Sequence, residues 1–174
     1  ISDDPQCTAG YVNLAIMQRE QGGDQEAEAL RNLRRALAIE SDYLPAFNQM
    51  ALLYYNRGQQ QGGKASLDLA EVVCRQAQII DGNYAPIYNT WGLVKMEKGN
   101  VIEALRFFER AIELDGEMFE AQMNFAQITL SFRGYEDARR AFAKAVELKG
   151  DNYEAHFGLG AALRGLEQFD QAKA

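Results

Sequence analysis

The sequence of 174 residues contains only three prolines, two cysteines and one histidine. So few prolines leave long stretches of the chain free to form helices. Cys7 and Cys74 are too few for a disulfide framework, and two distant cysteines with a single histidine do not make a zinc site. We expect Cys74, in the apolar stretch 71–80, to be a small buried hydrophobic residue. The sequence therefore predicts no metal and no cofactor.

The chain also lacks an excess of basic residues and any long apolar run. It has 25 acidic against 18 basic side chains, a formal charge of −7, whereas sequence-independent nucleic-acid binding requires a basic surface. No apolar run approaches the roughly 18 residues of a membrane span. The first residue is Ile1 and no secretory signal pattern is present. The compartment stays open: cytoplasmic, or periplasmic and envelope-associated if a signal has been removed.

The usual catalytic patterns are missing as well. We expect the one histidine, His156, to have a structural role, which leaves no base for a Ser/His/Asp set. The pairs Gly22-Gly23 and Gly62-Gly63 lack the Lys-Ser/Thr ending of a phosphate-binding loop. The basic cluster of Arg31, Arg34 and Arg35 is typical of a solvated outer helix face. We therefore predict that the chain is not an enzyme.

What the sequence does contain is a period of about 34 residues. Three series of small residues recur with spacings of mostly 34 residues, with longer intervals of 36 and 41 only in the first half of the chain. The three series are Ala15, Ala51, Gly92, Ala126 and Gly160; Ala29, Ala70, Ala104, Ala138 and Ala172; and Ala36, Ala77, Ala111 and Ala145.

Each period contains two amphipathic helices. Apolar and small residues in 88–92 and again in 104–114 recur at i, i+3, i+4 and i+7, and Gly99-Asn100 separates the two stretches. Gly116 follows the second stretch, where glycine commonly ends a helix in the left-handed conformation. The unit is therefore two antiparallel helices joined by a short turn. We expect the small residues to lie where helices cross closely, and Trp91 to be buried.

This unit resembles the tetratricopeptide repeat. The residues that carry the resemblance are Tyr88, Trp91-Gly92, Ala104, Phe108 and Ala111, then Phe125-Ala126, Tyr135, Ala138, Phe142 and Ala145, and finally Leu159-Gly160, Phe169 and Ala172. The proline that usually follows the second helix is replaced by Ser41, Gly82, Gly116 and Gly150. The resemblance implies an all-α fold, a right-handed α-solenoid of about five helix-turn-helix repeats.

The predicted units differ in completeness. Residues 1–7 read like the tail of a preceding repeat or cap, and the last unit breaks off early in its second helix. Its apolar residues, among them Leu159, Leu163 and Phe169, suggest that the array continues, or that a partner or a second copy covers this end by self-association. The expected repeats are 8–43, 44–84, 85–118, 119–152 and a truncated 153–174.

The repeat 44–84 carries seven extra residues. We expect a turn of glycine and glutamine around 58–64, followed by a long second helix from Lys64 to Ile80, because seven residues are close to two helical turns. Two interpretations stay open for this insertion. It is either a tolerated addition in an exposed loop or a partner-specific projection that uses Leu67 and Leu69.

In tetratricopeptide-repeat proteins the first helices line a concave groove that commonly holds a peptide or a partner helix. One Asn lies in each of the first four first helices, and Asn offers both a donor and an acceptor to a peptide backbone. The alternative is that these Asn residues are soluble filler on a helix face. The predicted binding residues are Asn13, Asn48, Gln49, Leu52, Tyr55, Asn89, Thr90, Leu93, Met96, Met123, Asn124 and Gln127.

Some members of the family clamp the acidic C-termini of heat-shock chaperones with Lys, Arg and Asn. The corresponding positions here supply no cations, so we do not expect that ligand. The sequence predicts a non-catalytic scaffold that binds a peptide or partner helix in its groove, as part of a larger assembly. The alternative is a recognition or regulatory module of a longer multidomain protein or enzyme. A looser resemblance is to bacterial tetratricopeptide proteins of type IV pilus assembly and gliding motility.

Overall fold

The computed structural model describes residues 6–23, 25–61 and 63–166. Within these ranges the regular secondary structure is entirely α-helical, and no helix is long and apolar enough to cross a lipid bilayer. The chain divides into two compact units, residues 1–104 and 105–174. The expected tail at 1–5 and the residues 167–174 of the last repeat, including Phe169, lie outside the described ranges.

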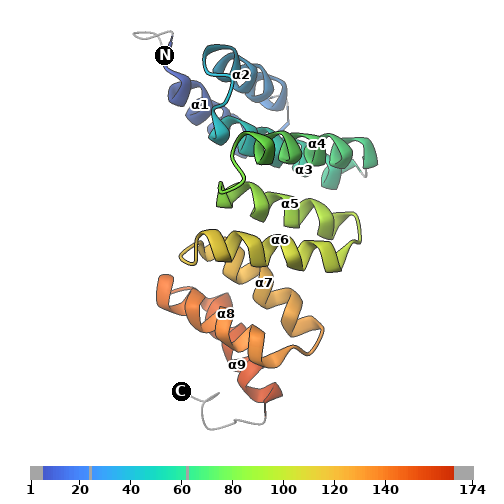
Figure 1. Ribbon diagram of the computed structural model, residues 1–174, viewed down its shortest axis with the longest axis vertical. Helices are drawn as coiled ribbons and strands as arrows, with labels where there is room; N and C mark the ends of the chain where they lie inside the picture. Colours follow the sequence, from blue (N-terminus) through green and yellow to red (C-terminus); the bar gives the residue numbers. More distant parts are fainter. Residues whose placement is uncertain (1–5, 24, 62, 167–174) are drawn as a thin grey trace. The chain divides into compact units, whose positions relative to one another are not determined.

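Unit 1 is built from helix hairpins that stack through their first helices. Its helices are α1 (Thr8–Gln21), α2 (Gln25–Ile39), α3 (Leu44–Gln61), α4 (Lys64–Ile80), α5 (Ala85–Glu97) and the first turn of α6 (Val101–Leu114). Helix α1 packs on α2 and α3 packs on α4, and α3 also packs against both α1 and α5 (Figure 1). Each second helix presents an apolar stripe to this core, as Ala29, Leu33 and Ala36 do in α2.

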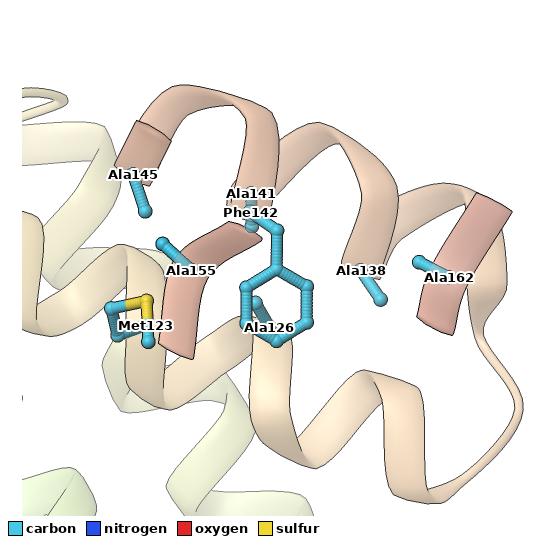
Figure 2. Packing of buried hydrophobic residues seen from close by; sticks show 8 residues of the cluster. All are labelled: Met123, Ala126, Ala138, Ala141, Phe142, Ala145, Ala155 and Ala162. Carbon is cyan, nitrogen blue, oxygen red and sulfur yellow. The ribbon is translucent and has the colours of Figure 1, made fainter. Parts of the chain in front are cut away.

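Unit 2 continues with the rest of α6, followed by α7 (Phe119–Ser131), α8 (Tyr135–Leu148) and α9 (Tyr153–Gly165). Helix α8 packs on both α7 and α9. In Figure 2 the ring of Phe142 points from α8 into a cluster of small side chains. A Cβ atom on Gly158 would lie 2.3 Å from Cζ of Phe142, so α9 can approach α8 this closely only because residue 158 is glycine.

The small residues of the periodic series are packing positions, as the sequence predicted. Every alanine of these series in the described residues is at most 1% exposed. Trp91, Phe108 and Phe142 are buried among them, and Cys74 is fully buried, also as predicted. Short side chains at these places let two helices approach closely, and the large residues between them fill the remaining space.

The insertion in the second repeat is accommodated differently from the prediction. Helix α4 does run from Lys64 to Ile80, but α3 continues through Gly58 to Gln61, so most of the expected turn is helical. The added residues therefore lengthen both helices by about one turn each. An antiparallel pair has to grow together if the side chains of both helices are to stay in contact.

The contact between Gly58 and Leu67 shows why the longer pair holds together. A Cβ atom on Gly58 would lie 2.6 Å from Cδ2 of Leu67, so the two added turns touch directly. Leu67 is only 7% exposed, so it does not belong to the projecting surface that one of the two interpretations of the insertion gave it. Leu69, in contrast, is 48% exposed.

The glycines between repeats do not act as predicted. Among the described residues, positive φ values occur at Gly22, Gly23, Gly99 and Arg133, all in turns within a repeat, and Gly116 is not one of them. The second helices instead end on an ordinary helical hydrogen bond, such as Asp115 N to Ala111 O at 2.9 Å. Glycine is not needed there for a left-handed conformation.

What these glycines provide is a carbonyl acceptor. Tyr88 Oη donates to Gly82 O at 2.8 Å, and Gln122 Nε2 donates to Gly116 O at 3.0 Å. His156 Nε2 lies 2.8 Å from Gly150 O, which makes Nε2 the protonated nitrogen because a carbonyl only accepts. The three donors occupy the same place in successive repeats, six residues after the acceptor. His156 thus has the structural role expected for it, although its side chain is exposed.

We expect Tyr88→Phe to lower the free energy of unfolding by about 1 kcal/mol, because it removes the donor to Gly82 O and keeps the ring. Gln78 Nε2 also donates to this hydroxyl, at 3.3 Å, and loses its acceptor in the variant. Urea unfolding followed by circular dichroism measures the change. Tyr153→Phe, at a 78% exposed tyrosine, is the matched control and should leave the stability unchanged. Equal effects of the two substitutions would contradict a role for this hydrogen bond.

Candidate first-helix binding surface

In unit 1 the first helices share a face that remains open to solvent. On α5, Asn89, Leu93 and Met96 are half-buried, whereas the residues between them, 90–92 and 94–95, are buried. The spacing of three and four residues places the three side chains on one stripe of the helix. This stripe faces away from the packed core, since all other faces of α5 are covered.

Corresponding stripes run along α1 and α3. Ile16 and Arg19 on α1, and Leu52 and Tyr55 on α3, are half-buried at helical spacing. Because α3 packs against both α1 and α5, the stripes of the three helices adjoin. We refer to these side chains together as the first-helix face of unit 1: Ile16, Arg19, Leu52, Tyr55, Asn89, Leu93 and Met96.

Two of the predicted binding residues lie inside the unit. Asn48 is 9% exposed and Thr90 is 1% exposed, and Thr90 Oγ1 donates to Asn48 Oδ1 at 2.7 Å. This hydrogen bond joins α3 to α5 and satisfies both groups, so it fixes how the two first helices pack. Asn13, by contrast, is exposed on α1. The four Asn residues are therefore in different environments.

A polar network closes the end of the face formed by α3 and α5. Gln59 Nε2 lies 2.8 Å from Tyr55 Oη and 3.0 Å from Glu97 Oε2. Burial, together with the charge of Glu97, raises the pKa of Tyr55 above its usual value. The Tyr55 hydroxyl thus stays protonated at neutral pH and is held in place as a hydrogen-bonding group.

Two further polar side chains near these helices have atoms without a partner. Arg19 Nε and Gln49 Oε1 are buried, and neither has a hydrogen bond within the described part of the chain. Burial lowers the pKa of the Arg19 guanidinium, and the charge of Glu20 only partly offsets this. Buried polar atoms are normally hydrogen-bonded. The side chain of Arg19 as a whole is only half-buried, so its guanidinium is suited to donate to a ligand oxygen.

Unit 2 presents the remaining predicted residues on α7. Met123 is 6% exposed and belongs to the core cluster around Phe142 (Figure 2). Asn124 is half-buried and Gln127 is exposed. Only the last two of these predicted residues are open to a ligand. Their part in binding stays a prediction.

A charge network links the helices behind the first-helix face of unit 1. Lys95, only 9% exposed, lies 2.8 Å from Glu71 and 2.6 Å from Glu103. Lys98 lies 2.7 Å from Glu71 and 2.8 Å from Asp68. Burial opposes ionisation of Glu71, but its hydrogen bonds to the two lysines outweigh this and hold the pKa of Glu71 below its usual value. The pKa of Lys95 is raised, because its carboxylate partners likewise outweigh burial.

The described residues offer little for catalysis or metal binding. No group of three or more His, Cys, Asp and Glu side chains in these ranges is arranged to hold a metal ion. Cys7 and Cys74 are both free thiols, and burial raises the pKa of Cys74 far above its usual value. A buried thiol with a raised pKa is a poor nucleophile.

Sequence reasoning missed Arg19 and the charge network. Arg19 follows Ile16 by three residues and so lies on the same helical stripe, which was a usable signal. The charge network left no such signal in the sequence, because Glu71, Lys95 and Glu103 come from three helices, and sequence spacing does not reveal how those helices are placed.

Comparison with known proteins finds a family match to one repeat and a shared fold along most of the chain. Residues 85–118 match the family model of the tetratricopeptide repeat. Tetratricopeptide repeat protein 8 of Homo sapiens is 32% identical over 81 residues, which is 47% of this chain and 15% of that protein. The chain thus spans a small part of the length of this curated relative.

Solved structures agree along most of the chain. TTC0263, a thermophilic tetratricopeptide-repeat protein of Thermus thermophilus, superimposes with a TM-score of 0.80 at 24% identity, covering 94% of this chain and 84% of that one. PilF of Pseudomonas aeruginosa superimposes with a TM-score of 0.78 at 20% identity, covering 95% and 72%. Together with the family match, they identify an all-α, tetratricopeptide-type solenoid fold, as the sequence predicted.

Proposed function

We propose that this tetratricopeptide-repeat protein is a non-catalytic interaction scaffold, and that the first-helix face of unit 1 binds a peptide or a helix of a partner protein. The observation that carries the proposal is the open stripe on α5. Leu93 and Met96 are kept accessible on a helix whose other faces are buried, and Leu52 and Ile16 lie on the equivalent stripes of α3 and α1. Apolar side chains in a row between polar groups suit an amphipathic ligand.

The polar groups of the face would orient the ligand. Arg19 has a buried Nε with no acceptor, and Tyr55 is fixed by Gln59 at the other side. A peptide carbonyl or carboxylate would complete the hydrogen bonds of Arg19, while its apolar side chains lie on Leu52 and Leu93. With one such arginine, the face lacks the several cations of the chaperone-tail clamp, and we do not propose that ligand.

The ligand face can be tested with peptides selected from a display library on the immobilised whole chain. Leu93→Glu should weaken their binding tenfold or more, because it places a charge in the apolar stripe. Val72→Glu is the matched control: Val72 is a half-exposed apolar residue of the second helix α4, and this variant should bind normally. If both variants bound equally well, the first-helix face would not be the binding surface.

Asn89→Ala and Asn124→Ala separate the two interpretations of the Asn residues. If their amides bind the backbone of the ligand, each substitution should weaken the selected peptides several-fold, by the roughly 1 kcal/mol of a lost hydrogen bond. If Asn is filler, affinity should stay unchanged. Asn48 is unsuitable for this comparison, because its replacement also breaks the hydrogen bond from Thr90.

The same face would serve a larger assembly or a longer protein. The human relative is matched over only 15% of its length, so the similar segment is a small part of a longer protein there. We therefore keep, as a second proposal, a recognition or regulatory role within a longer multidomain protein. The fold shared with PilF keeps a bacterial envelope or motility assembly among the settings to be tested.

A further inference from the structure

We propose a second docking surface, within unit 2, for an amphipathic helix of a partner protein that carries charges of opposite sign on its two flanks. A groove of about 570 Å³ lies between α6 and α8, with α7 beneath it. None of the residues predicted for ligand binding on α7 lines this groove. The proposal therefore does not rest on the first-helix face.

The floor of the groove is apolar apart from Gln122 of α7. Phe125 of α7 packs against the core cluster around Phe142 but is only half-buried, and it lines the groove. Ile112 of α6 is half-buried beside it, and Ala141 of α8 is buried. A partner side chain of the size of Leu or Phe would cover the exposed part of Phe125 and Ile112.

The walls of the groove carry opposite charge. Glu109 and Glu113 project from α6, whereas Arg140 and Lys144 stand on α8 with Asp137 beside them. Glu109 has no ion pair within the described residues, and its side chain is exposed. One wall thus has a net negative charge and the other a net positive charge.

The existing ion pairs of these walls are weak enough to be exchanged. On α8, Arg140 pairs with Asp137 and Lys144 pairs with Glu147; on α6, Glu113 pairs with Arg110. In each pair the two residues are three positions apart on the same helix. Such pairs contribute little because water solvates both partners. A ligand that offers charges of its own can therefore engage the walls without breaking a structural contact.

This combination favours a helix over other occupants. Small-molecule pockets are lined mainly by apolar groups, whereas most side chains around this groove are charged or polar. Nucleic acid is disfavoured by the acidic wall. A helix laid between α6 and α8 places an apolar stripe on Phe125, with basic residues towards Glu109 and Glu113 and acidic residues towards Arg140 and Lys144.

Two synthetic helical peptides test this assignment on the whole chain, with affinities measured by isothermal titration. Both carry Leu at i, i+4 and i+7; the first has Lys on one flank and Glu on the other, and the second has Glu on both flanks. The wild-type chain should prefer the first peptide. Glu109→Lys combined with Glu113→Lys makes both walls basic, so it should weaken the first peptide about tenfold and bind the second more tightly.

Controls locate the effect in the groove. Circular dichroism should show the double variant folded, since both glutamates are exposed. Leu93→Glu, in unit 1, should leave binding of the first peptide unchanged, which separates this surface from the one proposed above. The proposal is overturned if neither peptide binds the wild type, if the double variant keeps the wild-type preference, or if Leu93→Glu abolishes binding of the first peptide.

Discussion

Phe142→Ala is expected to lower the free energy of unfolding by about 3–5 kcal/mol, in the upper half of that range. The ring is 2% exposed, and its neighbours in the cluster are largely alanines from α7, α8 and α9 (Figure 2). Alanine has no side-chain rotamers with which to fill a cavity, so the space left by the ring stays open. The loss then includes the full cavity contribution in addition to the lost burial of the ring.

Urea unfolding of the whole chain measures how far Phe142→Ala lowers the free energy of unfolding. Hydrogen exchange followed by mass spectrometry shows which helices are destabilised. Exchange should accelerate in α7, α8 and α9, because each element of a repeat array depends mainly on its neighbours. Phe132→Ala is the matched control in the same unit: Phe132 is 66% exposed, and its loss should cost less than about 0.5 kcal/mol. A similar cost for both phenylalanines would refute the assignment of Phe142 as the centre of this core.

Glu71→Ala is expected to destabilise the chain by about 3 kcal/mol. Glu71 contacts both Lys95 and Lys98 in a largely buried network, and its removal leaves each lysine with less compensation for its lost hydration. Each lysine keeps one carboxylate partner, Glu103 for Lys95 and Asp68 for Lys98. The loss of stability is therefore expected at the lower end of the range found when a buried ion pair is broken. Glu136→Ala, which breaks an exposed pair with Arg139, should have little effect.

The pH dependence of stability provides a separate check on this network. The pKa of Glu71 in the folded chain lies below the usual 4.5, so its contribution is complete above about pH 4.5 and is lost as the pH falls through the folded value. The raised pKa values of the two lysines act in the opposite direction: their contribution is complete below about pH 10.5 and is lost at higher pH. The difference between wild type and Glu71→Ala should therefore be largest near neutral pH. A difference that stays constant down to pH 2 would contradict the ion pairs.

The sequence predicted the repeating part of the fold well, because the period and the packing have the same cause. Ala104, Ala111 and Phe108 recur where a helix crosses its neighbours, so their spacing records the contacts. The insertion was harder to place. Gly58 looked like a turn residue, whereas its lack of a side chain serves the contact with Leu67 inside a helical pair.

The candidate site was less predictable for a related reason. Helical spacing identified the stripe of Asn89, Leu93 and Met96, but not that Asn48 is satisfied by Thr90. Spacing gives the direction of a side chain around its own helix, whereas burial depends on how far the neighbouring helix covers it. The groove over Phe125 was missed because three helices form it, and Phe125 was noted only as a residue of the repeat pattern.

The hydrogen bonds to Gly82, Gly116 and Gly150 have a consequence for how repeats of this kind can diverge. A phenol, an amide and an imidazole all serve as the donor, although they differ in size, polarity and aromatic character. The contact between successive repeats requires one N–H or O–H group within hydrogen-bonding distance of the glycine carbonyl. It does not require a particular type of side chain. Successive repeats can therefore lose their resemblance at this position while the angle between neighbouring hairpins is preserved. Spacing is then a more durable mark of the array than any single residue type.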